Sequence, residues 1–166
     1  MADLSERDIS NIVEYVMAEL KERGGSAVVA TGIFPDVDRA AAAASVAQKI
    51  WMALRLEKRK EIIAHLRERL RENAQVLSWS AWRETGLGRY EDKIEKNLLV
   101  INKTPGIEDL EPTAWSGDRG LTLMERAPFG VIGSITPVTN PTATVINNAI
   151  AMIAAGNGIV FNAHPS

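Results

Sequence analysis

The 166-residue sequence contains no cysteine. A disulfide framework, a zinc site built on thiolates and a cysteine nucleophile are therefore excluded within it. Only two histidines are present, and they are far apart and lack a cluster of further ligands. We therefore predict no metal site.

The sequence also lacks an excess of charge of either sign. Its 19 lysine and arginine residues are balanced by 21 aspartate and glutamate residues, which gives a formal net charge of -2. Proteins that bind nucleic acid usually carry a basic surface. This balance therefore favours no nucleic-acid partner.

Long apolar runs are missing as well. None approaches the roughly 20 residues that a membrane-spanning helix needs, and the first residues lack the apolar block of a secretory signal. With 46% hydrophobic and 24% charged residues, the composition is that of a globular protein. We expect a cytoplasmic protein with no membrane partner.

Residues 1–23 have the pattern of an amphipathic helix. Apolar residues recur at helical spacing from Ile9 to Leu20, and charged residues fill most other positions. Gly24 and Gly25 end this helix and begin a stretch of small residues, so residues 24–32 are predicted to be a flexible linker. The first helix is therefore expected to be an appendage.

Four more helices are predicted before residue 104. The first begins after the N-cap Asp36, and the others span about residues 57–73, 74–85 and 90–103. The apolar face of the first consists of Val37, Ala40, Ala41, Ala44, Ala47 and Trp51. The four tryptophans are expected in the core or at an interface, and they are Trp51, Trp79, Trp82 and Trp115.

The pattern changes after Pro112. Residues 121–126 are predicted to form a strand or one arm of a hairpin, and residues 130–135 and 159–161 two buried strands. Between the latter lies an almost wholly apolar helix at 142–155, which begins with Asn140 as its cap and Pro141 as its first residue. A strand, a helix and a strand in this order predict a right-handed βαβ unit with parallel strands.

This unit alone makes an incomplete sheet, because two parallel strands under one helix leave faces and edges poorly protected. We therefore expect an α/β fold in which N-terminal helices precede the start of a Rossmann-like parallel sheet. The sequence is predicted to be the front part of a larger protein.

Open parallel sheets bind ligands beyond the carboxyl ends of their strands. Two such ends are predicted, at residues 135–140 and 162–165. The first runs into a helix N-terminus, whose N–H groups and dipole suit an anion or an oxyanion. No G-x-G-x-x-G motif follows the first strand, so spacing alone gives little support for a dinucleotide.

Five motifs together are similar to a known family. They are Glu84–Lys93 with Lys96–Asn97, Ala114–Gly117, Glu125–Gly133, Thr136–Thr142 and Ala154–Asn157. They resemble the aldehyde dehydrogenase superfamily, and within it the coenzyme A-acylating enzymes of bacterial ethanolamine and propanediol utilisation. The resemblance covers about residues 33–166. It implies oxidation of a short aldehyde by NAD, through a thioester on a cysteine, to an acyl-coenzyme A.

The resemblance also implies that residues 33–166 are the N-terminal part of an aldehyde dehydrogenase nucleotide-binding domain. The family's catalytic cysteine lies beyond the matched region, so the chain as given is expected to be inactive alone. The full-length enzyme is expected to be a homo-oligomer.

Site residues follow from the same resemblance. In the family an asparagine side chain helps to hold the oxyanion; alignment on Pro137 and Pro141 without a gap gives that place to Thr139, whereas residue chemistry favours Asn140. Alternatively, Asn140 only caps the helix. The implied cofactor-binding residues are Ile135, Thr136, Pro137 and Val138 on the nicotinamide side, and His164 and Pro165 near the adenosine ribose.

The N-terminal helix resembles the encapsulation peptides that load such enzymes into bacterial microcompartments. Residues 4–23 are therefore expected to bind a shell protein, and the enzyme to lie in the microcompartment lumen. Alternatives remain open: an ordinary terminal helix, a non-catalytic fragment or adaptor that binds shell proteins, or an acid-forming NAD-dependent aldehyde dehydrogenase. Acid-forming members usually have tryptophan directly after the first proline, where this sequence has Val138.

Overall fold

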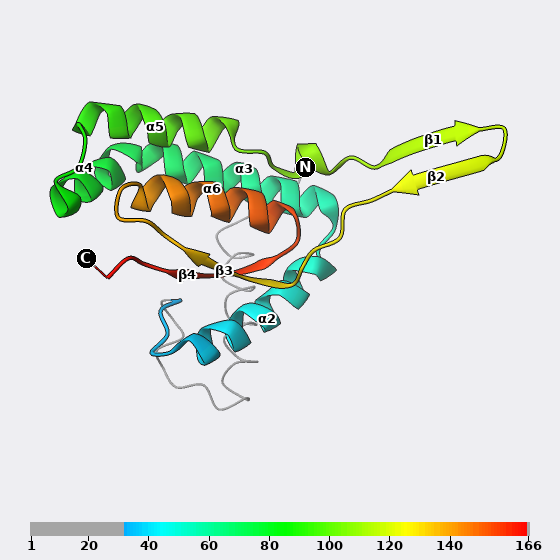
Figure 1. Cartoon of the computed structure of the whole chain (residues 1–166), viewed down its shortest axis with the longest axis horizontal. Coiled ribbons are helices and arrows are strands. Elements are labelled where there is room, and N and C mark those ends of the chain that lie inside the picture. The colour runs from blue at the N-terminus through cyan, green and yellow to red at the C-terminus, as the bar shows by residue number, and fades with distance from the viewer. Residues whose placement is uncertain (1–31, 166) are drawn as a thin grey trace.

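The computed structural model describes residues 32–165. The predicted helix at residues 1–23 and nearly all of the linker at 24–32 lie outside these residues. The described part begins with helices and ends with a strand–helix–strand unit (Figure 1). Its helices are α2 (Val37–Ala53), α3 (Leu56–Glu72), α4 (Ala74–Thr85), α5 (Tyr90–Lys103) and α6 (Pro141–Ala154), with a 3-10 turn η2 at Ile107–Leu110. Its strands are β1 (Thr113–Gly117), β2 (Gly120–Met124), β3 (Val131–Ile135) and β4 (Gly158–Asn162).

The helix ends are set by local capping. The Asp36 carboxylate accepts a hydrogen bond of 2.8 Å from the backbone N–H of Arg39 at the start of α2, as predicted. Helix α4 ends at Gly86, whose φ of 65° lies in the left-handed region that glycine adopts without strain. The predicted helix bounds are confirmed to within a residue or two.

The inward face predicted for α2 is partly wrong. Val37 is 69% exposed and Ala47 is also exposed, whereas Ala43 is buried. Helix α2 lies obliquely against β3 and β4 (Figure 1), so only part of its predicted apolar face contacts these strands.

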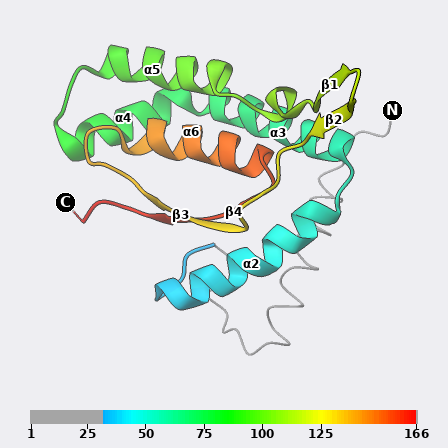
Figure 2. The ribbon, with the colours of Figure 1, turned by 45° about the vertical axis from the view of Figure 1, so that its right-hand side comes forward.

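Helices α3, α4, α5 and α6 form the main core. Figure 2 shows α3, α5 and α6 lying together on one side of β3 and β4, with α2 on the other side. Residues of these helices and of the turn η2 are buried together, and they are Ile63, Ala74, Ile101, Ile107, Ile146, Ile150 and Ala154.

A chain of buried polar side chains joins three of these helices. The Thr142 hydroxyl donates to Asn97 Oδ1 at 3.2 Å, Asn97 Nδ2 donates to Ser78 Oγ at 2.8 Å, and Ser78 Oγ donates to the Ala74 carbonyl at 2.7 Å. Asn97 and Ser78 are fully buried. Because each member finds partners, the network fixes the start of α6 against α5 and α4.

The βαβ unit is present as predicted. Strands β3 and β4 are parallel, in a register that runs from Val131 opposite Gly158 to Ile135 opposite Asn162. The sheet also has a cover from outside this unit, because α6 lies on one face and α2 on the other (Figures 1 and 2). A Cβ added to Gly158 would lie 2.6 Å from the Ala44 carbonyl oxygen, so glycine permits the close approach of α2.

The prediction that both strands are buried is also corrected. Ile135 is 80% exposed, and Val131 and Phe161 are exposed too. Within residues 32–165 the sheet has only these two strands, so each has one unpaired edge.

The segment predicted as a strand or hairpin arm is the second arm of a hairpin. Strands β1 and β2 pair antiparallel from Thr113 opposite Met124 to Gly117 opposite Gly120, and the pair projects away from the helices (Figure 1). Every residue of both strands is exposed. The sequence did not predict β1, because residues 113–117 show no clear alternation of apolar and polar residues.

The tryptophans divide unequally between core and surface. Trp51 is half-buried and donates through Nε1 to the Ile153 carbonyl at 2.9 Å. Trp79, Trp82 and Trp115 are 44%, 40% and 53% exposed, so a place in the core is wrong for these three. Their place at an interface stays a prediction.

No helix in the part of the chain that the structure describes has the length and apolar character needed to cross a membrane.

Candidate functional site

The carboxyl ends of β3 and β4 lie at one edge of the sheet. Ile135 pairs with Asn162, and Thr136 then donates from its backbone N–H to the Asn162 carbonyl at 3.0 Å and from its hydroxyl to the same oxygen at 3.3 Å. Thr136 is buried. This pairing brings residues 135–140, at and after the end of β3, to the same edge as His164 and Pro165, after β4.

The other predicted cofactor residues at this edge face solvent to different degrees. Ile135 and Pro137 are exposed and Val138 is half-buried. His164 and Pro165 are exposed. The edge therefore offers apolar side chains on an open surface, and only Thr136 is withdrawn into the structure.

Asn140 occupies the N-cap position of α6, followed by Pro141 as the first helical residue, as predicted. Its side chain, however, makes no capping hydrogen bond, so the expectation that asparagine caps the helix through its side chain is wrong. The amide makes two other hydrogen bonds. Oδ1 accepts from Lys96 Nζ, and Nδ2 donates to Thr139 Oγ1 at 3.4 Å.

Lys96 comes from the middle of α5, and sequence reasoning did not identify it as a site residue. It stood in one of the family motifs, but nothing in the sequence pattern indicated that its side chain meets a residue 44 positions later. On the same helix, Lys93 is buried. Burial, followed by the nearby charge of Lys96, lowers the pKa of Lys93 below its ordinary value.

The Asp92 carboxylate, in the first turn of α5, is held by an arginine. Asp92 accepts two hydrogen bonds from the Arg89 guanidinium, at 2.7 and 2.8 Å, and this interaction lowers the pKa of the carboxyl. A carboxyl held in its charged form is a poor general acid. No group of three or more histidine, cysteine, aspartate or glutamate side chains that could hold a metal ion occurs among residues 32–165.

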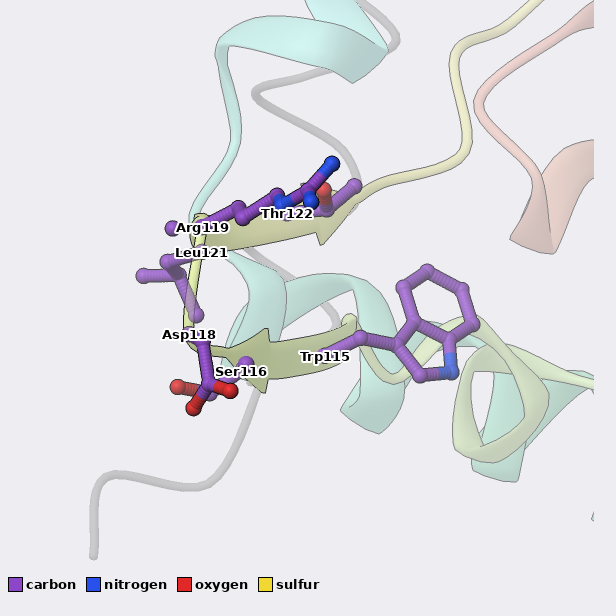
Figure 3. Close-up of a pocket in the computed structure, with 8 residues that line it drawn as sticks. Trp115, Ser116, Asp118, Arg119, Leu121 and Thr122 are labelled. Atoms are coloured by element: carbon purple, nitrogen blue, oxygen red, sulfur yellow. The ribbon is translucent and has the colours of Figure 1, made fainter.

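A separate hollow lies on the hairpin (Figure 3). It is lined by residues of β1, β2 and their turn, and the side chains of Trp115, Asp118 and Arg119 point in different directions. In Figure 1 the hairpin extends from the end of the molecule opposite to the C-terminus, where the strands end. It therefore contributes nothing to the edge that carries the predicted site residues.

Comparison with known proteins agrees with the fold. The model of the aldehyde dehydrogenase family matches residues 26–166, so the chain belongs to that family.

Within the family, the similarity is to enzymes that form acyl-coenzyme A. An acetylating acetaldehyde dehydrogenase from Bilophila wadsworthia is 45% identical, over 99% of this chain and 36% of its own length. The solved propionaldehyde dehydrogenase from the fucose-utilisation microcompartment of Clostridium phytofermentans is 51% identical, with a TM-score of 0.76, over 81% of this chain and 31% of its own.

A third relative was solved with ligands. The propionaldehyde dehydrogenase from Rhodopseudomonas palustris, with bound CoA and an acylated cysteine, is 47% identical, with a TM-score of 0.76, over 81% of this chain and 31% of its own. The chain thus spans about a third of the length of the relatives it matches. The resemblance and the incomplete α/β fold expected from the sequence are confirmed.

Proposed function

We propose that this chain is the N-terminal part of a coenzyme A-acylating aldehyde dehydrogenase. The whole enzyme would oxidise a short aldehyde such as acetaldehyde or propanal with NAD and pass the acyl group to coenzyme A. The proposal is supported by the similarity to acetylating and propionaldehyde dehydrogenases and by the geometry of the strand ends. The reactive cysteine would come from sequence outside these 166 residues.

The observation that carries the proposal is the state of the Asn140 side chain. An asparagine at an N-cap usually uses its side-chain oxygen on the helix backbone. Here that oxygen is bound to Lys96 instead, which leaves the amide nitrogen as a donor beside the end of β3. A donor in this place can stabilise an oxyanion that forms on an aldehyde carbon under thiolate attack.

The strand ends also fit a dinucleotide. Pro141 has no N–H, and the Asn140 side chain caps neither Thr142 nor Ala143, so the N–H groups of these two residues remain available to an anionic group. Ile135, Pro137 and Val138 offer apolar surface, and His164 and Pro165 stand at the end of the neighbouring strand. NAD, when bound, would supply the acceptor for the hydride of the aldehyde.

Each part of the edge would then have its own role. Thr136 fixes the two strand ends to each other, since both its backbone N–H and its hydroxyl bind the Asn162 carbonyl. Ile135 to Val138 would bound the nicotinamide side, and His164 and Pro165 the adenosine ribose. Asn140, with Thr139 beside it, would face the reacting carbonyl.

We further propose that residues 33–166 belong to the nucleotide-binding domain and that residues 24–32 link it to a targeting helix at 1–23. Through residues 4–23 this helix would bind a microcompartment shell protein, which would place the homo-oligomeric enzyme in the microcompartment lumen of the cytoplasm. Shell association that is unchanged after deletion of residues 1–23 would contradict this assignment.

The test of the activity uses the complete gene product. Its intact mass shows whether the chain continues, and NADH formation from propanal is followed with and without coenzyme A. We expect NADH formation that depends on coenzyme A and yields propanoyl-coenzyme A. Free propanoate formed equally well without coenzyme A would favour an acid-forming enzyme, and shell binding without either reaction would favour an adaptor.

A further inference from the structure

We propose that Lys96 is a positioning residue that orients and polarises the Asn140 amide for oxyanion binding. The inference rests on the proposed function, because it needs an oxyanion at the end of β3. It adds a residue from another helix, α5, to the set that the family resemblance implied.

The contact fixes which end of the amide faces the site. A carboxamide has an acceptor oxygen and a donor nitrogen that can exchange places by rotation of the group. The Lys96 ammonium can only donate, so it selects the arrangement in which Oδ1 of Asn140 faces α5. Nδ2 then lies on the side of the Thr139 hydroxyl, 3.4 Å away, with hydrogens left for a further acceptor. The assignment therefore gives a donor role to the Asn140 amide, and the Thr139 hydroxyl, which accepts from it, keeps its own hydrogen.

The ammonium also strengthens the amide as a donor. A positive charge at Oδ1 draws electron density from the nitrogen, and hydrogen bonds in such chains polarise one another. None of the ion pairs within residues 32–165 includes Lys96 or its neighbour Lys93. Neither ammonium is held in a described ion pair, so both add a positive potential where a negative charge would develop.

Lys96 is itself held by the packing of α5. The next residue, Asn97, is fully buried and accepts a hydrogen bond from Thr142 in the first turn of α6. Consecutive residues of α5 thus hold both sides of Pro141: Lys96 holds Asn140 and Asn97 holds Thr142. This arrangement fixes the Asn140 amide relative to the end of β3 better than a contact from a surface loop would.

The experiment is a mutant cycle in the complete enzyme. Lys96→Met removes the charge and the donor while keeping an unbranched side chain, Lys96→Arg restores both, and Asn140→Ala removes the amide. Lys103→Met makes the same substitution at an exposed position at the far end of α5 and serves as the control. Unfolding midpoints of all variants show that they are folded; should Lys96→Met fail this check, Lys96→Leu, which also lacks charge and donor, replaces it with the same expected losses.

We expect Lys96→Met to lower kcat with propanal by about 10- to 100-fold, while KM changes by less than about threefold, because the contact acts in the transition state. Lys96→Arg should recover most of the loss, and Lys103→Met should match the wild type. In the Asn140→Ala background, Lys96→Met should lower kcat by no more than about twofold further, because its effect passes through the missing amide.

Two outcomes would overturn the assignment while leaving the proposed function intact: wild-type activity in Lys96→Met, or a Lys96→Met loss that is undiminished in the Asn140→Ala background. A wild-type enzyme without coenzyme A-dependent activity would instead overturn the proposed function, and the positioning role with it.

Discussion

The two strand pairs of this molecule have the same size and very different surroundings. Each consists of two five-residue strands paired along their whole length, antiparallel in β1–β2 and parallel in β3–β4. The first pair is exposed at every position, with Leu121 71% exposed. The second has α6 on one face and α2 on the other. The backbone just before β3 is held by Asn157, whose Oδ1 accepts from the N–H groups of Phe129 and Gly130 at 2.7 and 3.1 Å.

The comparison shows that strand pairing by itself says little about what holds a region in place. A two-stranded ribbon is at best marginally stable alone, whereas helices and buried polar contacts position the ends of β3 and β4. The candidate site lies at the ends of β3 and β4. Substitutions can test the difference between the two strand pairs, and the free energies of unfolding below refer to the 166-residue chain.

The largest effect is expected from breaking the polar chain beside the site. Asn97→Ala leaves Ser78 and Thr142 without their buried partner and should lower the free energy of unfolding by about 2–4 kcal/mol. Urea unfolding followed by tryptophan fluorescence measures it. Asn102→Ala, on the same helix, removes only the exposed hydrogen bond that Asn102 Oδ1 accepts from Arg71 Nε at 2.8 Å and should lower it by less than about 1 kcal/mol. Equal losses in the two variants would refute the role given to the network.

The cover supplied by α2 can be tested with two glycines of the parallel sheet. Gly158→Ala places a methyl group 2.6 Å from the Ala44 carbonyl and should cost about 1–3 kcal/mol of unfolding free energy. Gly133→Ala meets no atom within 4 Å and should change it by less than about 0.5 kcal/mol. A Gly158→Ala variant as stable as the wild type would show that α2 does not lie tightly on β4.

Lys93 allows a test of charge burial near the site. Its pKa is lowered in the folded chain relative to the ordinary value of 10.5, so the unfolded chain binds the proton more tightly. The charged side chain therefore opposes folding at neutral pH, and the opposition fades as the pH rises toward 10.5. Lys93→Met should raise the free energy of unfolding by about 0.5–2 kcal/mol at pH 7, and by less at pH 10. A gain that is equal or larger at pH 10 would contradict the burial of a charged Lys93.

The smallest effect is expected on the hairpin. Leu121→Thr should change the free energy of unfolding by less than about 0.5 kcal/mol, because the side chain is already exposed. The conservative change Ile150→Val in the core, at a fully buried residue, should cost more, about 0.5–1.5 kcal/mol. If thermal unfolding showed the reverse order, the hairpin would have to be packed against other parts of the chain.

The parts of the fold that were predictable depend on local signals. Asp36 capping α2, Gly86 ending α4 and Pro141 beginning α6 each act within a few residues, and apolar spacing located the helices and the βαβ unit. The family motifs located the edge at residues 135–140. These features need no knowledge of which elements meet.

The features that were missed depend on contacts between distant segments. Lys96 meets Asn140 across 44 positions, and Gln48 on α2 donates to the Gly156 carbonyl across 108. Burial of Lys93 and Asn97 runs against the usual placement of such residues. Periodicity assigns a residue to a helix face but does not say which element covers that face. It therefore predicted neither the packing of α2 against the sheet nor the hydrogen bond between Asn140 and Lys96.

The most direct test of the account is the rate of coenzyme A-dependent NADH formation by the complete enzyme before and after Asn140→Ala. Removal of one oxyanion donor should lower kcat by about 100- to 1,000-fold, with the protein folded and its KM for propanal little changed. An Asn140→Ala enzyme that turns over propanal at the wild-type rate would contradict the assignment of the strand-end amide to the chemistry.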